Sequence, residues 1–189
     1  AENLTATSKC QPALYLHGLI GLALLKERLP NLQPAAAAGL SLGEFTAHAA
    51  AGTFSFIDGL KLVSQRGTFM EESCNATDGA MAALIGGDEE KVRALAEATD
   101  VDVANLNAPG QIVISGTSAG IDDAVGKAKE FGIRRAIKLN VAGAYHSRLM
   151  AGARDNLVAT PKLKMLLDPE GSVRVAGAIR RAFPAEPVD

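Results

Sequence analysis

Between residues 80 and 141 the sequence alternates short apolar runs with amphipathic stretches, and this alternation constrains the fold most. Four segments have the length and composition of β-strands: Ala80–Ile85, Val101–Asn105, Gln111–Ser115 and Ile133–Val141. Two helices are expected between them, one over Asp88–Thr99 and one with apolar residues from Ile121 to Ala128, ended by Gly132. The resulting order, βαββαβ, is the ferredoxin-like arrangement, so the sequence predicts a small lobe of this kind.

The segments on either side of this lobe are predicted to form a larger α/β lobe into which the small lobe is inserted. We therefore expect residues 1–75 and 142–189 to form an α/β-hydrolase-like catalytic lobe that is apparently incomplete, and residues 76–141 the ferredoxin-like lobe. Three helices are predicted in the first part: Thr7–Leu29, capped by Thr7 or Ser8 and stopped by Pro30; Leu42–Ala51, closed by Gly52; and Ser55–Met70, where Asp58 completes a near capping box. The run 35–38 is expected to be a strand, and 173–181 a basic amphipathic helix.

Composition excludes several functions. The formal net charge is −2, and no run of Lys or Arg makes any segment strongly basic, so nucleic acid is not an expected partner. Cys10 and Cys74 lack metal-ligand spacing, and they fit a reducing compartment, which predicts a cytoplasmic protein without a metal site. Ala13–Leu25 is apolar but short for a bilayer and contains His17, so we expect a buried helix and no membrane span.

The run from Gly39 to Gly43 has the G-x-S-x-G pattern of a nucleophile elbow around Ser41. In such an elbow a tight strand-to-helix turn strains the serine and projects its hydroxyl at a helix N-terminus. There the backbone N–H of Leu42 and the helix dipole can stabilise an oxyanion. An ordinary Gly/Ser turn has the same five residues, so the pattern needs further support.

A serine nucleophile needs a general base, and the chain has three histidines. His48 lies seven residues after Ser41 on the same helix, about 10 Å along its axis, and points at a neighbouring turn. His17 is expected to be a core or interface residue of its apolar helix. His146 follows the last strand of the small lobe, in a loop that can reach the elbow. Elimination of the other two makes His146 the predicted base.

Arg66 is the third candidate residue, because it shares a helix face with the apolar Leu62 and Met70. The pattern by itself favours an arginine whose stem covers apolar surface and whose head pairs with Glu71 or Glu72. The alternative is a clamp for a substrate carboxylate, for which the planar guanidinium is suited.

These residues resemble those of a known family, the malonyl-CoA:acyl carrier protein transacylases. The resemblance rests on five segments in the family's order: Gln11-Pro-Ala-Leu14 (Q-P-A-L), Gly39-Leu-Ser-Leu-Gly-Glu44 (G-H-S-L-G-E), Gln65-Arg-Gly-Thr-Phe-Met70 (R-G-x-x-M), Asn105-Leu-Asn-Ala-Pro-Gly-Gln111 (N-x-N-x-P-G-Q) and Gly143-Ala-Tyr-His-Ser147 (G-A-F-H-S). They occur in this order within residues 7 to 150, which makes the match specific.

The resemblance implies Ser41 as nucleophile, His146 as base and Arg66 as the partner of the malonyl carboxylate. It further implies a group of residues near the substrate: Gln11, Met70, Asn105 and Asn107. The implied reaction moves a malonyl group from malonyl-CoA to the phosphopantetheine thiol of acyl carrier protein in fatty acid biosynthesis. No bound cofactor or metal is implied, since the thioester is already an activated acyl group.

The sequence departs from the family pattern in three places. Leu40 stands where the family has His beside the nucleophile, the N-terminal G-Q-G-x-Q segment is absent, and so is a C-terminal stretch that orients the catalytic His. Residues 170–180 resemble the family's last segment, joined after a shortened link. We therefore expect the sequence to be part of a longer chain.

Three alternative functions share part of this pattern. A polyketide-type acyltransferase domain would use the same mechanism. A serine esterase would use the elbow but would not need Arg66. A non-catalytic relative that binds carrier protein is suggested by Leu40 and the absent oxyanion segment.

Overall fold

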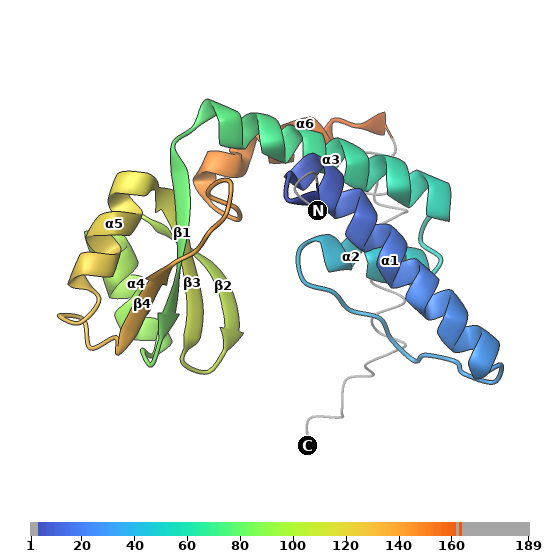
Figure 1. Ribbon diagram of the computed structural model, residues 1–189, viewed down its shortest axis with the longest axis horizontal. Coiled ribbons are helices and arrows are strands. Elements are labelled where there is room, and N and C mark those ends of the chain that lie inside the picture. Colours follow the sequence, from blue (N-terminus) through green and yellow to red (C-terminus); the bar gives the residue numbers. More distant parts are fainter. Residues whose placement is uncertain (1–3, 162, 164–189) are drawn as a thin grey trace, which may run out of the picture. The chain divides into compact units, whose positions relative to one another are not determined.

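The computed structural model describes residues 4–161 and residue 163. The chain divides into two compact units: Ala1–Thr68 with Asn156–Asp189, called the elbow unit, and Phe69–Asp155, called the sheet unit. Helix α3 (Phe56–Ala76) begins in the elbow unit and ends in the sheet unit (Figure 1). The helix expected over 173–181 and the family-like segment 170–180 lie outside the described residues.

The elbow unit contains the three predicted helices. They are α1 (Thr7–Arg28), α2 (Leu42–Ala50) and the first part of α3. Gly52 follows α2 with a φ of 75°, as a left-handed cap requires. Ser55 and Asp58 cap α3, because the Asp58 backbone N–H donates to Ser55 Oγ at 3.1 Å. Helix α3 runs beyond the expected end at Met70, since nothing in its last residues breaks a helix.

The predicted cap of α1 is wrong. Its N-cap is Ala6, which makes no side-chain capping bond, and Thr7 is already helical. The Thr7 hydroxyl instead accepts a hydrogen bond from Gln11 Nε2 at 2.8 Å, one turn further along the helix. Thr7 cannot be the N-cap, because it is the first residue of the helix and the N-cap precedes it.

The small core of the elbow unit lies among α1, α2 and α3. Five buried residues form it: Tyr15, Leu42, Phe54, Leu62 and Val63. The Tyr15 hydroxyl donates to the backbone oxygen of Phe56 at 3.2 Å, which joins the start of α3 to α1. A Cβ on Gly59 would lie 2.0 Å from the same hydroxyl, so this approach requires glycine.

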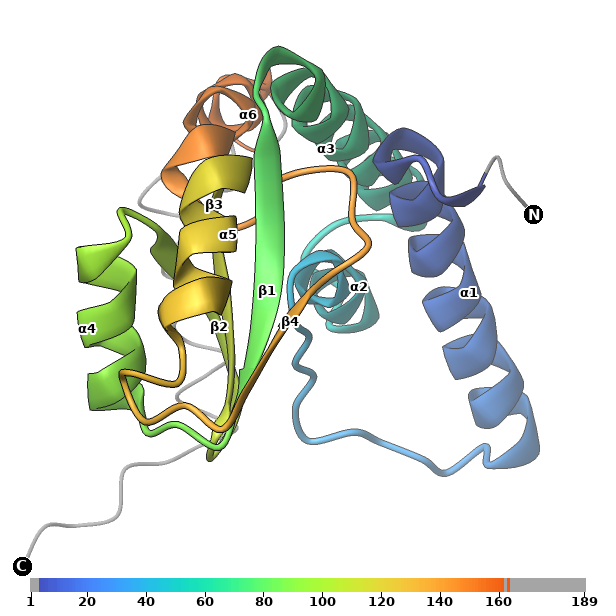
Figure 2. The same cartoon turned by 60° about the vertical axis from the view of Figure 1, so that its left-hand side comes forward.

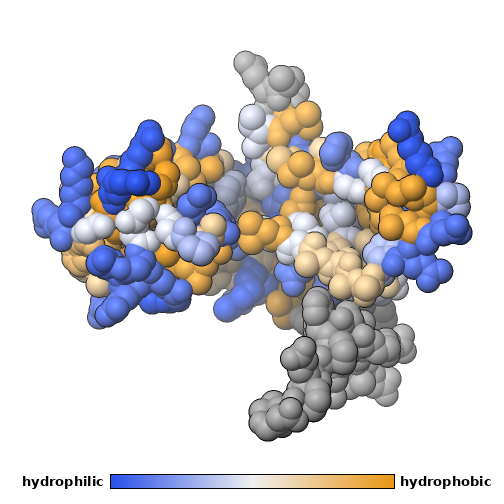
Figure 3. All heavy atoms as spheres, turned by 90° about the horizontal axis from the view of Figure 1, so that it is seen from below, coloured by the Kyte–Doolittle hydropathy of each residue, from blue (hydrophilic) through white to orange (hydrophobic). Residues whose placement is uncertain are grey.

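The expectation of a buried α1 is wrong for most of the helix. Only Thr7, Gln11 and Tyr15 are buried, whereas Leu24 is 55% exposed and His17 is exposed. The reason is geometric. Within the described residues α2 and α3 cover only one side of α1, whereas the apolar side chains of α1 are distributed around the whole helix, so most of them stay exposed. Figure 3 shows orange, apolar surface interspersed with blue, hydrophilic surface on one face of the described chain.

The strand expected over residues 35–38 is not formed. Residues 33–40 are exposed and lie in irregular backbone. A strand needs a partner for its backbone hydrogen bonds, and the described part of the elbow unit contains no strand. The turn at Ser41 is therefore present without the strand that was expected to lead into it.

The sheet unit has the strand and helix order that the sequence predicts. In chain order its elements are β1 (Gly79–Ile85), α4 (Glu89–Ala98), β2 (Asp102–Ala108), β3 (Gln111–Thr117), α5 (Ser118–Lys127) and β4 (Arg135–Lys138). The sheet order is β2-β3-β1-β4, with every neighbouring pair antiparallel. Helices α4 and α5 cover one face of the sheet, which Figure 2 shows edge-on. A 3₁₀ turn, η2 (Arg148–Met150), and α6 (Ala151–Val158) follow.

The core of the sheet unit lies between the sheet and these two helices. Its residues alternate along the strands and recur at helical spacing along α4 and α5, as in Leu84, Ile114, Leu95 and Ile121, all at most 1% exposed. Asp88 caps α4 by accepting the backbone N–H of Lys91 at 2.9 Å. Strand β4 is shorter than expected, because only four residues pair with β1 before the chain turns away.

Within the described residues, none of the helices is both long and apolar enough to span a membrane. The same part of the chain holds no cluster of three or more His, Cys, Asp or Glu side chains that could bind a metal ion.

Candidate active site

Ser41 has the strained backbone that the elbow pattern predicts. Its φ of 52° and ψ of −112° lie outside the regions that L-residues ordinarily adopt, and it is the N-cap of α2. Gly39 makes this turn feasible, because a Cβ there would lie 2.0 Å from the backbone carbon of Gly43. A Cβ on Gly43 itself would meet nothing within 4 Å, so only the first glycine is required by the turn.

The turn places the serine at the start of a helix, as an oxyanion site needs. The backbone N–H of Leu42, the first residue of α2, follows Ser41 directly, and the helix dipole favours negative charge there. The Leu42 side chain is buried in the core of the elbow unit, which fixes this end of the helix. Leu40, the residue that departs from the family pattern, is 70% exposed and takes no part in that core.

Arg66 contacts the serine directly. Its Nη2 donates to Ser41 Oγ at 3.0 Å, although the two residues lie 25 positions apart. The serine oxygen is the acceptor in this bond, since a guanidinium has donors only. The expectation that Arg66 pairs with Glu71 or Glu72 is replaced by contacts with Ser41 and Gln11.

A chain of contacts holds the guanidinium in this place. Nη1 of Arg66 donates to Gln11 Oε1 at 2.5 Å, and Gln11 in turn donates to Thr7. Gln11 is 5% exposed and Thr7 8% exposed, so both are buried. The guanidinium carbon also lies 5.7 Å from the centre of the Phe45 ring, within the range of a cation–π contact.

Burial lowers the pKa of Arg66, and the carboxylate of Glu44 opposes this effect. The guanidinium nevertheless remains charged at neutral pH, since arginine does not deprotonate in proteins. A half-buried guanidinium of this kind can bind an anionic group through charge-assisted hydrogen bonds.

The predicted base, His146, lies in the sheet unit, in the loop after β4. It is exposed and has a φ of 60°, whereas its neighbours Ala144 and Ser147 are buried. Ser147 Oγ donates to the Ala144 backbone oxygen at 2.7 Å and accepts the Leu149 N–H at 3.2 Å. The loop thus exposes the imidazole between two fixed positions.

The other residues implied by the resemblance also lie in the sheet unit. Asn105 is half-buried on β2 and pairs with Val113, and the strand has irregularities on either side of it. Asn107 is exposed at the second irregularity, between Leu106 and Ala108. Met70 is buried in a small cluster with Cys74, Met150 and Ala153.

The remaining histidines do not contact Ser41 in any described bond. His48 Nδ1 lies 3.2 Å from Thr53 Oγ1, in the turn after α2, which confirms the direction expected from its spacing. His17 is exposed on α1, which excludes the core position, whereas the alternative position at an interface stays a prediction.

Two residues of this site were missed by sequence reasoning. Phe45 lies four residues after Ser41 on α2, and Thr7 lies four residues before Gln11 on α1. Side chains at i and i+4 are neighbours on a helix, so this spacing was a usable signal in both cases. The structure thus brings Ser41, Arg66 and Gln11 together in the elbow unit, with Phe45 and Thr7 supporting them.

A strained serine at a helix N-terminus is the geometry of a nucleophile elbow, a turn that serine enzymes of the α/β-hydrolase kind use. Comparison with known proteins agrees with this class. The family model described as "Acyl transferase domain" matches residues 1–173. This chain therefore belongs to the acyl transferase domain family.

The relatives found are malonyl transacylases. The chain is 46% identical over 176 residues to the malonyl CoA-acyl carrier protein transacylase of Bacillus subtilis, covering 89% of this chain and 52% of that protein. The solved malonyl CoA-acyl carrier protein transacylase of Coxiella burnetii is similar with a TM-score of 0.78 and 37% identity, covering 83% of this chain and 51% of that one.

A third similar structure is a malonyl-transacylase in complex with a type II PKS acyl-carrier protein. Its TM-score is 0.75 at 34% identity, over 83% of this chain and 52% of that one. This chain spans about half the length of the curated relatives that it matches.

Proposed function

We propose that this chain carries the acylation site of a malonyl-CoA:acyl carrier protein transacylase acting in fatty acid biosynthesis. The observation that carries the proposal is the 3.0 Å contact between Arg66 and Ser41 at the strained elbow. This contact supports the proposal, because a cation beside the serine would suit an acyl group with a free carboxylate. The names of the similar proteins support the same substrate and carrier.

In the first half-reaction His146 takes the proton of the Ser41 hydroxyl while the serine oxygen attacks the thioester carbonyl. The Leu42 N–H stabilises the oxyanion that forms. The carbon–sulfur bond then breaks, and coenzyme A leaves with the proton from His146. A malonyl ester of Ser41 remains.

In the second half-reaction the phosphopantetheine thiol of acyl carrier protein gives its proton to His146 and attacks this ester. The serine oxygen leaves and regains the proton. Throughout, Arg66 binds the malonyl carboxylate in place of its present contact with Ser41. Gln11 holds the guanidinium, and Asn105, Asn107 and Met70 belong to the substrate-binding residues of this proposal. No step needs a cofactor.

The proposal assigns residues 1–75 and 142–189 to an α/β-hydrolase-like catalytic lobe and residues 76–141 to a ferredoxin-like lobe. The antiparallel order β2-β3-β1-β4 supports the assignment of the small lobe. The elbow turn supports that of the larger lobe, because a strained serine at the start of a helix is typical of α/β-hydrolases.

A polyketide-type acyltransferase is a second candidate. The similar malonyl-transacylase that was solved with a type II PKS acyl-carrier protein favours it. The two functions share the chemistry at Ser41 and differ in the carrier protein, so transfer to carrier proteins of the two kinds would separate them.

Intact mass spectrometry after incubation with malonyl-CoA tests the proposed function. We expect one malonyl adduct on the unsubstituted protein and none on Ser41→Ala. Ser64→Ala is a matched control, because Ser64 lies on α3 of the same unit and donates to the Leu60 carbonyl. An adduct that persists in Ser41→Ala would rule out this nucleophile.

A further inference from the structure

The loop that carries His146 is anchored on both sides of the histidine. On the N-terminal side, Gly143 is packed so closely that a Cβ would lie 2.3 Å from Cys74 Sγ. Ala144 is fully buried, and a Cβ on Gly79 would lie 2.7 Å from its nitrogen. This side of the loop is therefore fixed by packing against α3 and β1.

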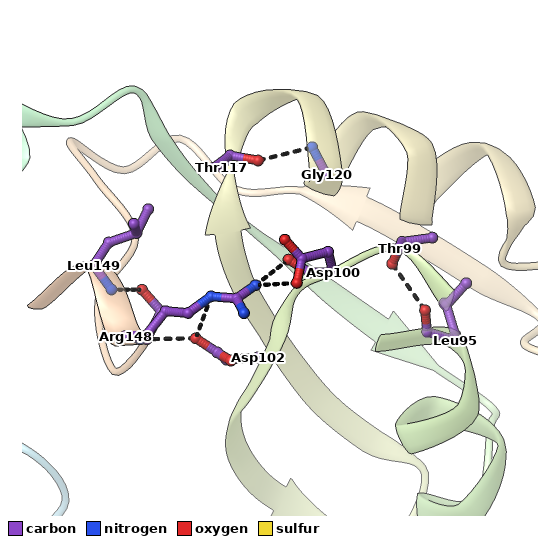
Figure 4. Close-up of polar contacts among 9 residues, drawn as sticks. Leu95, Thr99, Asp100, Asp102, Thr117, Gly120, Arg148 and Leu149 are labelled. Carbon is purple, nitrogen blue, oxygen red and sulfur yellow. Dashed lines mark hydrogen bonds and ion pairs between the residues drawn. The ribbon is translucent and has the colours of Figure 1, made fainter. Parts of the chain in front are cut away.

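On the C-terminal side the anchor is electrostatic and involves Arg148 (Figure 4). The Arg148 backbone N–H donates to Asp102 Oδ2 at 2.7 Å. Its Nη2 donates to Asp100 Oδ1 at 2.8 Å and also to the Asp100 backbone oxygen. Arg148 Nε and Asp102 Oδ2 lie 3.8 Å apart as a further ion pair.

These contacts join the histidine loop to the turn between α4 and β2, some 46 residues away in sequence. Asp100 has a φ of 54° in that turn, and His146 has a φ of 60°. A left-handed conformation costs a residue other than glycine about 1–2 kcal/mol, so it persists only where its surroundings impose it. Arg148 provides such surroundings two residues after His146.

The network is poorly placed to stabilise the fold as a whole. The Arg148 side chain is 53% exposed and that of Asp100 is 87% exposed. Exposed ion pairs contribute about 0–1 kcal/mol to the free energy of unfolding. Arg148 nevertheless makes four contacts with two carboxylates and a carbonyl, which fixes the geometry of the loop more than it adds stability.

We propose that Arg148, held by Asp100 and Asp102, is a positioning residue that sets the placement of the His146 imidazole. This inference rests on the proposed function, in which His146 is the general base. Arg148 acts through the loop backbone and does not touch the substrate. It should therefore affect the rate of proton transfer and leave substrate binding unchanged.

The kinetic test measures the acylation of Ser41 by malonyl-CoA as a function of its concentration. We expect Arg148→Ala to lower kcat roughly tenfold with KM unchanged, because small misplacements of a catalytic group are costly. Arg148→Lys should recover part of this loss, since it retains the charge without the planar fork. Arg93→Ala is the matched control: Arg93 is 58% exposed and pairs with Glu89 on α4 of the same unit.

A second readout does not depend on activity. Hydrogen exchange of the backbone amides of residues 146–149 should accelerate about tenfold in Arg148→Ala, because the loop opens locally. In the control Arg93→Ala, neither the melting temperature of the protein nor the exchange of the same amides should change. Asp100→Asn tolerates the left-handed backbone and should give a smaller effect of the same sign.

The outcomes separate this inference from the proposed function. If Ser41 is not acylated in the unsubstituted protein, the proposed function fails. Independently of that result, unchanged amide hydrogen exchange in Arg148→Ala would overturn the anchoring of the loop. If acylation occurs but Arg148→Ala retains full kcat, the positioning role is wrong. Equal losses in Arg148→Ala and Arg93→Ala would also overturn it, since they would show a general effect of charge.

Discussion

The two units of the chain are built in different ways. The sheet unit buries a continuous core between its sheet and helices, with Leu84, Leu95, Ile114 and Ile121 at most 1% exposed. The elbow unit has only five buried core residues within the described chain, and Leu24 on its longest helix is 55% exposed. The unit with the smaller core nevertheless carries the most strained residue of the proposed site, Ser41.

The difference shows that strain at a site need not depend on a large local core. At Ser41 the strain is imposed by the turn itself, by the absence of a side chain on Gly39 and by the anchoring of Leu42. In the sheet unit packing fixes the strands, and the proposed base stands on a loop that packing and ion pairs hold. The proposed site thus draws on short-range backbone constraints in one unit and on tertiary packing in the other.

The largest expected effect tests this contrast in packing. Leu84→Ala in β1 should reduce the free energy of unfolding by about 2–5 kcal/mol, because it leaves a cavity in a close-packed core. Leu24→Ala in α1 should change it by less than about 0.5 kcal/mol, as an exposed substitution does. Amide exchange of β1 and α1 measures the two effects separately. A loss above about 2 kcal/mol for Leu24→Ala would show that this face of α1 is covered in the protein in solution.

The sheet unit was the part of the fold most open to prediction. Its strands and helices follow from hydrophobic periodicity, and the φ of 72° at Gly110, between β2 and β3, is one that glycine adopts readily. The exposure of α1 was not predictable, because the sequence of an apolar segment does not reveal which other elements of the fold cover it. The strand expected at 35–38 failed for the same reason, since strands depend on partners elsewhere in the chain.

The next prediction concerns the elbow. Gly39→Ala should reduce acylation of Ser41 by about a hundredfold or more, because its Cβ would lie 2.0 Å from the Gly43 backbone and the turn must open. Gly43→Ala should retain most of the activity, since nothing lies within 4 Å of the added carbon. Single-turnover acylation, followed by intact mass, compares the two. Equal losses in both variants would show that the strain does not originate at Gly39.

A smaller effect is expected at Arg66. A charge-assisted hydrogen bond contributes about 1.5–3 kcal/mol, so Arg66→Ala should lower malonyl transfer about ten- to a hundredfold. Acetyl transfer does not use this contact and should be unchanged or faster, and Lys at this position should rescue malonyl transfer only in part. The measurement is the ratio of kcat/KM for malonyl-CoA to that for acetyl-CoA, with Arg28→Ala as a control on the exposed end of α1. If both substrates lose the same factor, Arg66 supports the elbow and does not select the substrate.

Part of the proposed site followed from the sequence and part did not. The elbow pattern alone predicted the strain at Ser41 and the helix after it, because the turn is local. The partner of Arg66 was not predictable from its helix face, which favoured Glu71 or Glu72, since a contact over 25 or 55 residues depends on how helices pack. The anchoring of the His146 loop by Arg148 likewise depends on a turn 46 residues away.

The smallest expected effect lies inside the well-packed unit. Ser115 on β3 is fully buried, and its Oγ has no hydrogen-bond partner among the described residues. A buried hydroxyl without a partner costs about 1–3 kcal/mol, and the cavity left by one oxygen offsets part of the gain from removing it. Ser115→Ala should therefore raise the free energy of unfolding by about 1 kcal/mol.

Ser118→Ala, three residues further along the chain, should change the free energy of unfolding in the opposite direction. Its hydroxyl donates to Asp78 Oδ1 at 2.6 Å at the exposed start of α5, so its removal should lower stability by up to about 1 kcal/mol. Urea unfolding of the two variants, followed by circular dichroism, decides between the signs. A loss of stability in Ser115→Ala would show that the hydroxyl is bonded in solution. Among the described residues, the core of the sheet unit would then contain no unsatisfied polar side chain of this kind.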